Sequence, residues 1–152
     1  MFKELTLEEQ YDKCIIDGKI LQQEKIDIHK IRSMLDIAKD DIDSAEDMER
    51  KEKPKWNTLY KTYYDALHTL VEAYLLFDKV KSLNHQCLFA FLCIKHPELD
   101  LDWNFFEKIR TKRNGIHYYG SHVGEIDWKE INLQIKVYIK LIQKILEQKI
   151  KE

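Results

Sequence analysis

The chain has 152 residues and a mass of 18.4 kDa, which fits one compact domain spanning residues 1–152. With 4 Gly and 2 Pro, it lacks the turn-forming residues that the many short strands of an all-β protein require. A formal net charge of −2 does not indicate a general nucleic-acid binder, and 44% hydrophobic residues are too many for a disordered chain. The longest segment without a formal charge, residues 82–94, is too short for a membrane helix of about 20 residues.

The N-terminus and the cysteines predict a cytoplasmic protein. The first residues, MFKELTLEEQ, are charged from Lys3 and lack the apolar region of a signal peptide. The spacing of Cys14, Cys87 and Cys93 is not that of a disulfide framework, so we expect reduced thiols. Cys87 and Cys93 lie in an apolar run without a CxxC or HxxxH pattern, which favours buried thiols over a zinc site with His85 and His96. We therefore predict no metal and no cofactor.

Three helices are predicted in the first half of the chain. Thr6 and Glu9 form a capping-box pattern, which predicts a helix from about Leu7 to Glu24. A second helix, ending before Pro54, is predicted by apolar residues at spacings of three and four: Ile28, Ile31, Leu35, Ala38, Ile42 and Ala45. A third helix, from about Asn57 to Lys81, is apolar on most sides and is therefore expected at the centre of the fold.

Two further helices have clear start signals. Asn84 is a plausible N-cap for a helix from His85 to Lys95, which the His-Pro pair at residues 96–97 should end. Asp102 is expected to cap the next helix, from Trp103 to about Tyr118.

The last helix is predicted from Trp128 to about Lys151, after a loop over residues 120–126. Asp127 and Glu130 have the spacing of a second capping box at its start. No strand pattern of useful length competes with these helices. The sequence thus predicts an all-α fold, specifically an antiparallel up-and-down bundle of four long helices plus a short one.

One short segment, IRTKRNGIHYYG from Ile109, is strongly basic. Residues 108–122 contain four cationic side chains and no carboxylate. If the segment is helical, residues three, four and seven positions after Arg110 lie on the same stripe of the helix as Arg110. These residues are Arg113, Asn114 and His117. Asn114 and Gly115 form a pair typical of turns, so this arrangement requires a helix that stays regular through Gly115.

These residue types suit the chemistry of a phosphodiester. Arginine is always charged, and its planar fork matches phosphate oxygens. Histidine titrates near neutral pH and can accept a proton from a ribose hydroxyl, while Asn114 could orient either group. No cluster of carboxylates suggests bound magnesium. These residues therefore suit phosphodiester chemistry, including proton transfer from a ribose hydroxyl, and they require no metal.

The pattern Arg110-x6-His117-x-Tyr119 resembles the signature of HEPN (higher-eukaryote and prokaryote nucleotide-binding) domains. Residues 63–73 and 79–92 are also similar to the central and following helices of that family. The resemblance implies an all-α bundle that acts as a homodimer, with the two motif helices facing each other across a shared cleft. Many members are metal-independent ribonucleases, some are toxins paired with a nucleotidyltransferase antitoxin, and others only bind RNA or nucleotides.

The resemblance implies catalytic roles for Arg110 and His117. In some toxin–antitoxin pairs the motif tyrosine is adenylylated, and this residue corresponds to Tyr119. We expect the residues that bind RNA or a nucleotide to be Lys112, Arg113, Asn114 and Tyr119.

Two other interpretations remain open. The chain could be a non-catalytic helical module that binds a nucleotidyltransferase or another protein partner. Alternatively, the basic stripe could be a solvated helix face in a purely structural dimer, with His117 stabilising a helix C-terminus. His68, on the central helix, is expected to be a hydrogen-bonded core or interface histidine.

Overall fold

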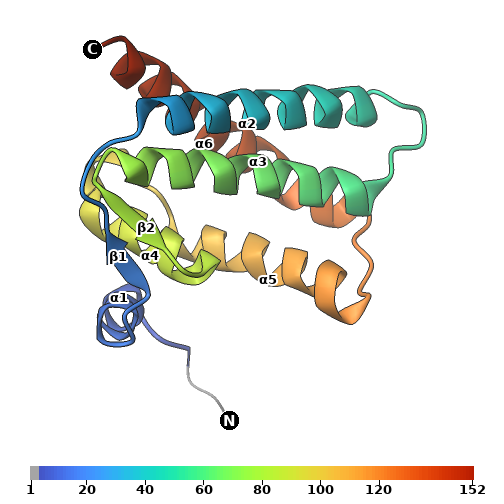
Figure 1. The fold of residues 1–152 in the computed structure, drawn as a ribbon. Coiled ribbons are helices and arrows are strands. Elements are labelled where there is room, and N and C mark those ends of the chain that lie inside the picture. The colour runs from blue at the N-terminus through green and yellow to red at the C-terminus, as the bar shows by residue number, and fades with distance from the viewer. Residues whose placement is uncertain (1–3) are drawn as a thin grey trace.

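The structure, a computed structural model that describes residues 4–152, is mostly helical (Figure 1). Within those residues it has six α-helices, one short 3-10 helix and two three-residue strands. In chain order the elements are α1 (Leu7–Ile16), β1 (Ile20–Gln22), α2 (Ile28–Glu49), α3 (Trp56–Leu76), β2 (Val80–Ser82), α4 (His85–Lys95), the 3-10 turn (Pro97–Leu99), α5 (Trp103–Tyr119) and α6 (Glu125–Lys151). None of the helices among the described residues is both long and apolar enough to cross a membrane.

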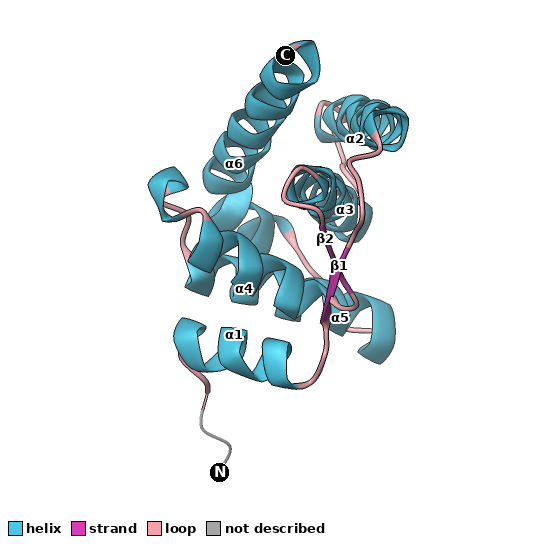
Figure 2. Cartoon of the chain, turned by 60° about the vertical axis from the view of Figure 1, so that its left-hand side comes forward, coloured by secondary structure: helices cyan, strands magenta, loops and turns pink. Residues whose placement is uncertain are grey.

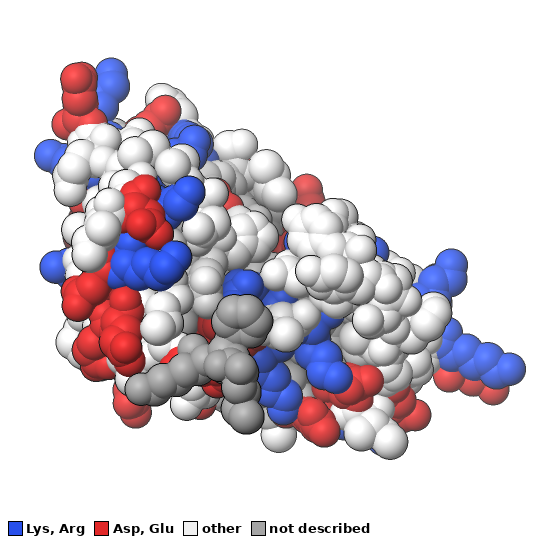
Figure 3. Space-filling view, turned by 90° about the horizontal axis from the view of Figure 1, so that it is seen from below, with Lys and Arg blue, Asp and Glu red and all other residues white. Residues whose placement is uncertain are grey.

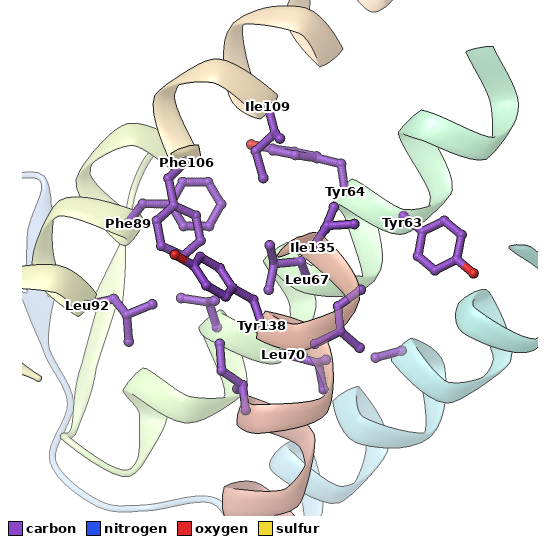
Figure 4. Close-up of a cluster of buried hydrophobic side chains, with 14 of the residues drawn as sticks. Tyr63, Tyr64, Leu67, Leu70, Phe89, Leu92, Phe106, Ile109, Ile135 and Tyr138 are labelled. Carbon is purple, nitrogen blue, oxygen red and sulfur yellow. The ribbon is translucent and has the colours of Figure 1, made fainter. Parts of the chain in front are cut away.

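Helix α3 lies at the centre of the fold, as the sequence predicted. It contacts α2, α4, α5 and α6, and most of its side chains are buried. Figure 4 shows the side chains of these elements converging, with Leu67 and Leu70 of α3 near residues of α4, α5 and α6. The rings of Phe89 and Phe106 stack at 4.5 Å, which joins α4 to α5 beside α3. This packing fixes the position of α5 relative to the start of α4.

The predicted capping residues begin their helices as expected. Thr6 and Glu9 form the capping box of α1, with each side chain accepting a hydrogen bond from the other residue's backbone N–H at 3.2 Å. Asn84 Oδ1 accepts from the N–H of Cys87 at 2.8 Å at the start of α4, and Asp102 caps α5. The helices predicted from Ile28 and from His85 are confirmed.

The first helix is shorter than the sequence predicted. It ends at Ile16 instead of continuing to Glu24, because Gly18 adopts a left-handed conformation with φ of 67°. Glycine reaches this region at little steric cost, so Gly18 serves here as a helix terminator rather than a weak helix residue. The residues that follow form β1.

The third helix is also shorter than predicted, since it ends at Leu76 rather than Lys81. Lys79 has φ of 59°, which turns the chain into β2. Strands β1 and β2 pair antiparallel, with Ile20 opposite Ser82 (Figure 2). The sequence shows no strand pattern of useful length, and these two strands escaped it because three residues are too few to show an alternating pattern.

The last helix begins three residues earlier than predicted, at Glu125. The carboxylate of Asp127 accepts a hydrogen bond from the N–H of Gly124 at 2.9 Å, so Asp127 lies inside the first turn. Glu130 instead forms an ion pair with Lys108 of α5 at 3.1 Å. The predicted capping box of Asp127 and Glu130 is therefore wrong.

The expectation of three reduced cysteines is also wrong. Cys14 of α1 and Cys87 of α4 form a disulfide, which fastens α1 against α4 (Figure 2). Cys93 is a buried free cysteine, and burial raises the pKa of its thiol to about 12. The sequence did not reveal the pair, because the two residues are 73 positions apart and only the packing of α1 on α4 brings them together.

Candidate functional site

Helix α5 carries the basic stripe, and it is regular through the Asn114–Gly115 step. The helix ends after Tyr119, where Gly120 has φ of 64° and the N–H of Ser121 donates to the carbonyl of Gly115 at 3.0 Å. This is the left-handed ending typical of helix C-termini. The stripe of side chains that the sequence predicted is therefore formed.

The two glycines of this segment are expected to respond oppositely to alanine. Gly115→Ala should raise the free energy of unfolding by about 0.5–1 kcal/mol, because alanine is the better helix residue. Its Cβ would make only ordinary contact with Ser121 at 3.5 Å. Gly120→Ala should lower the free energy of unfolding by about 1 kcal/mol, because its positive φ strains any residue with a Cβ. Urea denaturation of both variants measures the difference, and two changes of the same sign would contradict the described helix end.

A groove of about 530 Å³ lies between α5 and the first turn of α4. Helix α5 contributes Arg110, Arg113, Asn114, His117 and Tyr118, while the facing segment contributes Leu83, Asn84, His85 and Gln86. None of the described residues that line this groove is acidic. The groove therefore combines two arginines, two histidines and amide groups in one place.

The structure brings together four of the six predicted site residues and separates the other two. Arg110, Arg113, Asn114 and His117 line the groove. Lys112 lies elsewhere and pairs with Asp127 of α6 at 3.1 Å. Tyr119 is 82% exposed outside the groove, where Tyr118 takes the lining position. At 100° per residue, positions 112 and 119 lie on the opposite side of the helix from Arg110.

Arg110 is held at the groove by a carboxylate on its own helix. Its Nε and Nη2 atoms each donate to an oxygen of Glu107 at 3.0 Å. Glu107 also accepts a hydrogen bond from Nε2 of Gln86 at 2.9 Å, which links α5 to α4. This bidentate pair orients the guanidinium, and an anionic ligand would have to share Arg110 with Glu107.

Arg113 has weaker hydrogen-bonding partners than Arg110. Its Nη2 atom lies 3.5 Å from Asp65 Oδ1, and its guanidinium lies over the ring of Tyr64 at 5.6 Å. Its Nε atom is buried without a hydrogen-bond partner among the described residues. A buried donor without a partner is unfavourable, so an acceptor supplied by a ligand would be stabilised here.

The first turn of α4 lines the same groove. The side chain of Asn84 accepts a hydrogen bond from the N–H of Cys87. The backbone N–H groups of His85 and Gln86 come before the first hydrogen bond of the helix, so they have no partner within it. A helix N-terminus carries partial positive charge and favours an anion beside it. Its position opposite Arg110 and Arg113 reinforces the preference of the arginines for a negatively charged ligand.

His117 and Tyr118 lie at the outer end of the groove. Both are exposed, and their rings meet edge to face at 4.7 Å. His117 is in the last turn of α5, and no described carboxylate forms an ion pair with it. Its imidazole is therefore accessible to a ligand that enters the groove.

His85 is a groove residue that the sequence analysis missed. Its Nδ1 atom lies 2.9 Å from the hydroxyl of Tyr64, and its ring centre lies 3.7 Å from that of His68. Burial and the nearby charges of His68 and Arg113 lower the pKa of His85 to about 4. The predicted cap at Asn84 placed His85 in a first helical turn, but nothing in the sequence joined that turn to residues 110–118.

The zinc alternative, which the sequence disfavoured, has no geometric support among the described residues. Within residues 4–152 no group of three or more His, Cys, Asp or Glu side chains is arranged to hold a metal ion. Of the residues weighed for zinc, Cys87 is in the disulfide. His96 lies 2.5 Å from Asp78 and 3.1 Å from the hydroxyl of Tyr74, so it has hydrogen-bonding partners of its own.

Charges of both signs are mixed on the face of the molecule that Figure 3 shows. On the face in Figure 3, basic and acidic side chains lie among one another rather than in one extended basic area. The net charge of −2 is consistent with this view. Binding of an anion by this protein would therefore depend on a local site and not on a general positive surface.

The fold and the groove define a mostly helical protein with an arginine- and histidine-lined surface site. Comparisons with known families, with curated proteins and with solved structures each find no match to this chain.

Proposed function

We propose that this chain is a HEPN-like protein that binds RNA through its phosphates in the groove between α4 and α5. One observation carries the proposal: Arg110, Arg113 and His117 meet the N-terminus of α4 in a groove without acidic lining among the described residues. In this HEPN-like interpretation, α2, α3, α5 and α6 are the four long helices of an antiparallel up-and-down bundle. The phosphates of a free nucleotide would use the same contacts, so nucleotide binding is an alternative outcome of the test below.

The same groups are suited to metal-independent cleavage of RNA. His117 would accept the proton of the ribose 2′-hydroxyl, whose oxygen then attacks the adjacent phosphorus. Arg110 and Arg113 would stabilise the added negative charge as the bond to the 5′-oxygen breaks and that oxygen takes up a proton from solvent. The products would be a 2′,3′-cyclic phosphate and a 5′-hydroxyl. This toxin-like endoribonuclease activity is the catalytic part of the proposal.

A second candidate function is a non-catalytic helical module that binds another protein. It is favoured by three exposed apolar side chains on α6: Ile126, Leu133 and Val137, of which Leu133 is 79% exposed. Their spacing of seven and four residues places them on one face of the helix. Such a face suits a second copy of this chain or a nucleotidyltransferase partner, both of which the HEPN resemblance implies.

Binding of single-stranded RNA by two matched variants tests the proposed function. Arg110→Ala is expected to weaken RNA binding about tenfold, because a charge-assisted contact to phosphate is lost. Lys112→Ala removes the same charge from the opposite side of α5 and is expected to have little effect. Fluorescence anisotropy at several salt concentrations measures both affinities, and Arg110→Ala should also reduce the salt dependence.

Three other outcomes would each decide against part of the proposal. Equal losses in the two variants would indicate general electrostatic attraction instead of a groove. Strong binding of mononucleotides with no RNA binding would make the protein a nucleotide-binding module. Capture of a nucleotidyltransferase that survives Arg110→Ala, with no RNA binding by the wild type, would favour the protein-interaction candidate.

A further inference from the structure

The environment of His85 fixes which ring nitrogen carries a proton. The hydroxyl of Tyr64 is buried, and burial raises the pKa of this phenol, so it keeps its proton. Its hydrogen-bond partner is Nδ1 of His85 at 2.9 Å. A buried hydroxyl needs an acceptor, so Tyr64 donates to Nδ1 and the imidazole hydrogen lies on Nε2. Among the described residues, Nε2 of His85 has no hydrogen-bond partner.

A second histidine holds the His85 ring from the other side. The ring of His68 lies 3.7 Å from that of His85, and Nδ1 of His68 lies 2.8 Å from Oε1 of Glu72. A hollow of about 180 Å³ lined by His68 and Glu72 adjoins the groove, and both spaces are lined by Asn84 and His85. His85 is therefore oriented by Tyr64 and His68 where the groove and this hollow meet.

We propose that His85 is an anion-binding residue of this groove, whose Nε2–H donates to an oxygen of the same phosphate group that Arg110 and Arg113 bind. This inference rests on the proposed function, because it assumes that a phosphate occupies the groove. It adds a contact that the Arg-x6-His pattern does not contain. A neutral imidazole donor beside two guanidinium groups would recognise an oxyanion without adding a further positive charge to the empty groove.

Anion binding at this position should be coupled to proton uptake. In the empty groove, burial, His68 and Arg113 lower the pKa of His85 to about 4, so its ring is neutral at pH 7. A bound anion adds negative charge next to the ring and raises the pKa of His85 in the complex, where the added proton enters at Nδ1 and the hydroxyl of Tyr64 accepts from it instead of donating. The complex then binds more protons than the free protein, so affinity rises as the pH falls from the higher pKa of the complex toward about 4.

Other charged groups around His85 must be separated from this effect. His68 and Glu72 of α3 and Arg110 and Arg113 of α5 act on His85 directly. Lys30 of α2, Asp65 of α3 and Glu107 of α5 act on Glu72, Arg113 and Arg110 in turn. Carboxylates protonate mainly near pH 4, so measurements between pH 5 and 8 leave most of them charged. His117 lines the same groove, so a His85 variant and direct observation of the His85 ring are needed to separate the two histidines.

Sulfate is the probe, because it stays a divalent oxyanion throughout this pH range. Sulfate affinity of the wild type is expected to rise as the pH falls from 8 to 5. His85→Phe keeps an aromatic ring but removes Nε2–H, and it should bind sulfate about tenfold more weakly at pH 5 with a flatter pH dependence. His29→Phe changes an exposed histidine outside the groove and should behave as the wild type.

Nuclear magnetic resonance of the wild-type His85 ring gives a test that needs no variant. Saturating sulfate should raise the pKa of His85 from about 4 to above about 5. Sulfate binding with an unchanged His85 titration, or equal affinities of folded His85→Phe and wild type, would overturn the role of His85 and leave the groove proposal standing. A wild type that binds neither sulfate nor RNA would overturn both proposals.

Discussion

Replacing His117 with alanine is expected to lower the rate of RNA cleavage in EDTA by ~10²- to 10⁴-fold, the usual contribution of a positioned proton acceptor. His117 lies at the outer end of the groove, exposed and beside the two arginines. It is the accessible imidazole of the groove, whereas Nδ1 of His85 is occupied by the hydroxyl of Tyr64. Initial rates on a short fluorescent RNA, for wild type and variant prepared identically, measure the change.

His29→Ala is the matched control for this experiment. His29 is an exposed histidine in the first turn of α2 and does not line the groove, so its loss should leave the rate unchanged. RNA affinity should fall far less than the rate in His117→Ala, because the two arginines remain. Cleavage that is undiminished in His117→Ala, or that stops in EDTA, would show that the activity does not come from this site.

The helices were predictable where a local signal marks their ends. Asn84 and Asp102 have side chains that bond the backbone within three residues, so their effect is visible in the sequence alone. Gly18 and Lys79 were placed inside predicted helices, but both have a left-handed backbone conformation that ends the helix. Whether a residue adopts this conformation depends on the structure that follows it in the chain. At both positions, pairing of β1 with β2 favours a turn over another helical turn, and that pairing joins segments about 60 residues apart.

The candidate site was predictable only along one helix. Helical periodicity predicts that four side chains lie on one stripe, and in the structure all four line one groove: Arg110, Arg113, Asn114 and His117. Lys112 was included because it belongs to the same segment, and Tyr119 because it matches the tyrosine of the HEPN pattern, although the same periodicity places both on the opposite face. His85 could not be found in this way, because its position beside α5 results from packing of α4, α3 and α5 around Phe89 and Phe106.

Opening the disulfide between Cys14 and Cys87 is expected to lower the free energy of unfolding by about 2–5 kcal/mol. The bond spans 73 residues, and closing a loop of this length removes much of the entropy of the unfolded chain. It also holds α1 on α4, since α1 buries few side chains of its own: Gln10 and Cys14. Urea denaturation with and without dithiothreitol measures the difference.

A Cys14→Ser, Cys87→Ser double variant separates the bond from other effects of the reductant. It should match the reduced wild type and show no further response to dithiothreitol. Cys93 should not interfere, because its thiol is buried and its raised pKa, about 12, keeps it protonated and unreactive. Three free thiols in the native protein under non-reducing conditions would contradict the bond and restore the expectation of reduced cysteines.

The disulfide also bears on the groove and on the predicted cytoplasmic location. Cys87 is in the first turn of α4, next to His85 and Gln86, so the bond anchors the turn that faces Arg110. If it only anchors α1, the reduced protein should still bind RNA at temperatures where it remains folded. Disulfides are rare in reducing cytosol. A bond that resists millimolar glutathione can persist in a cytosol, whereas one that opens there would leave α1 held by packing alone.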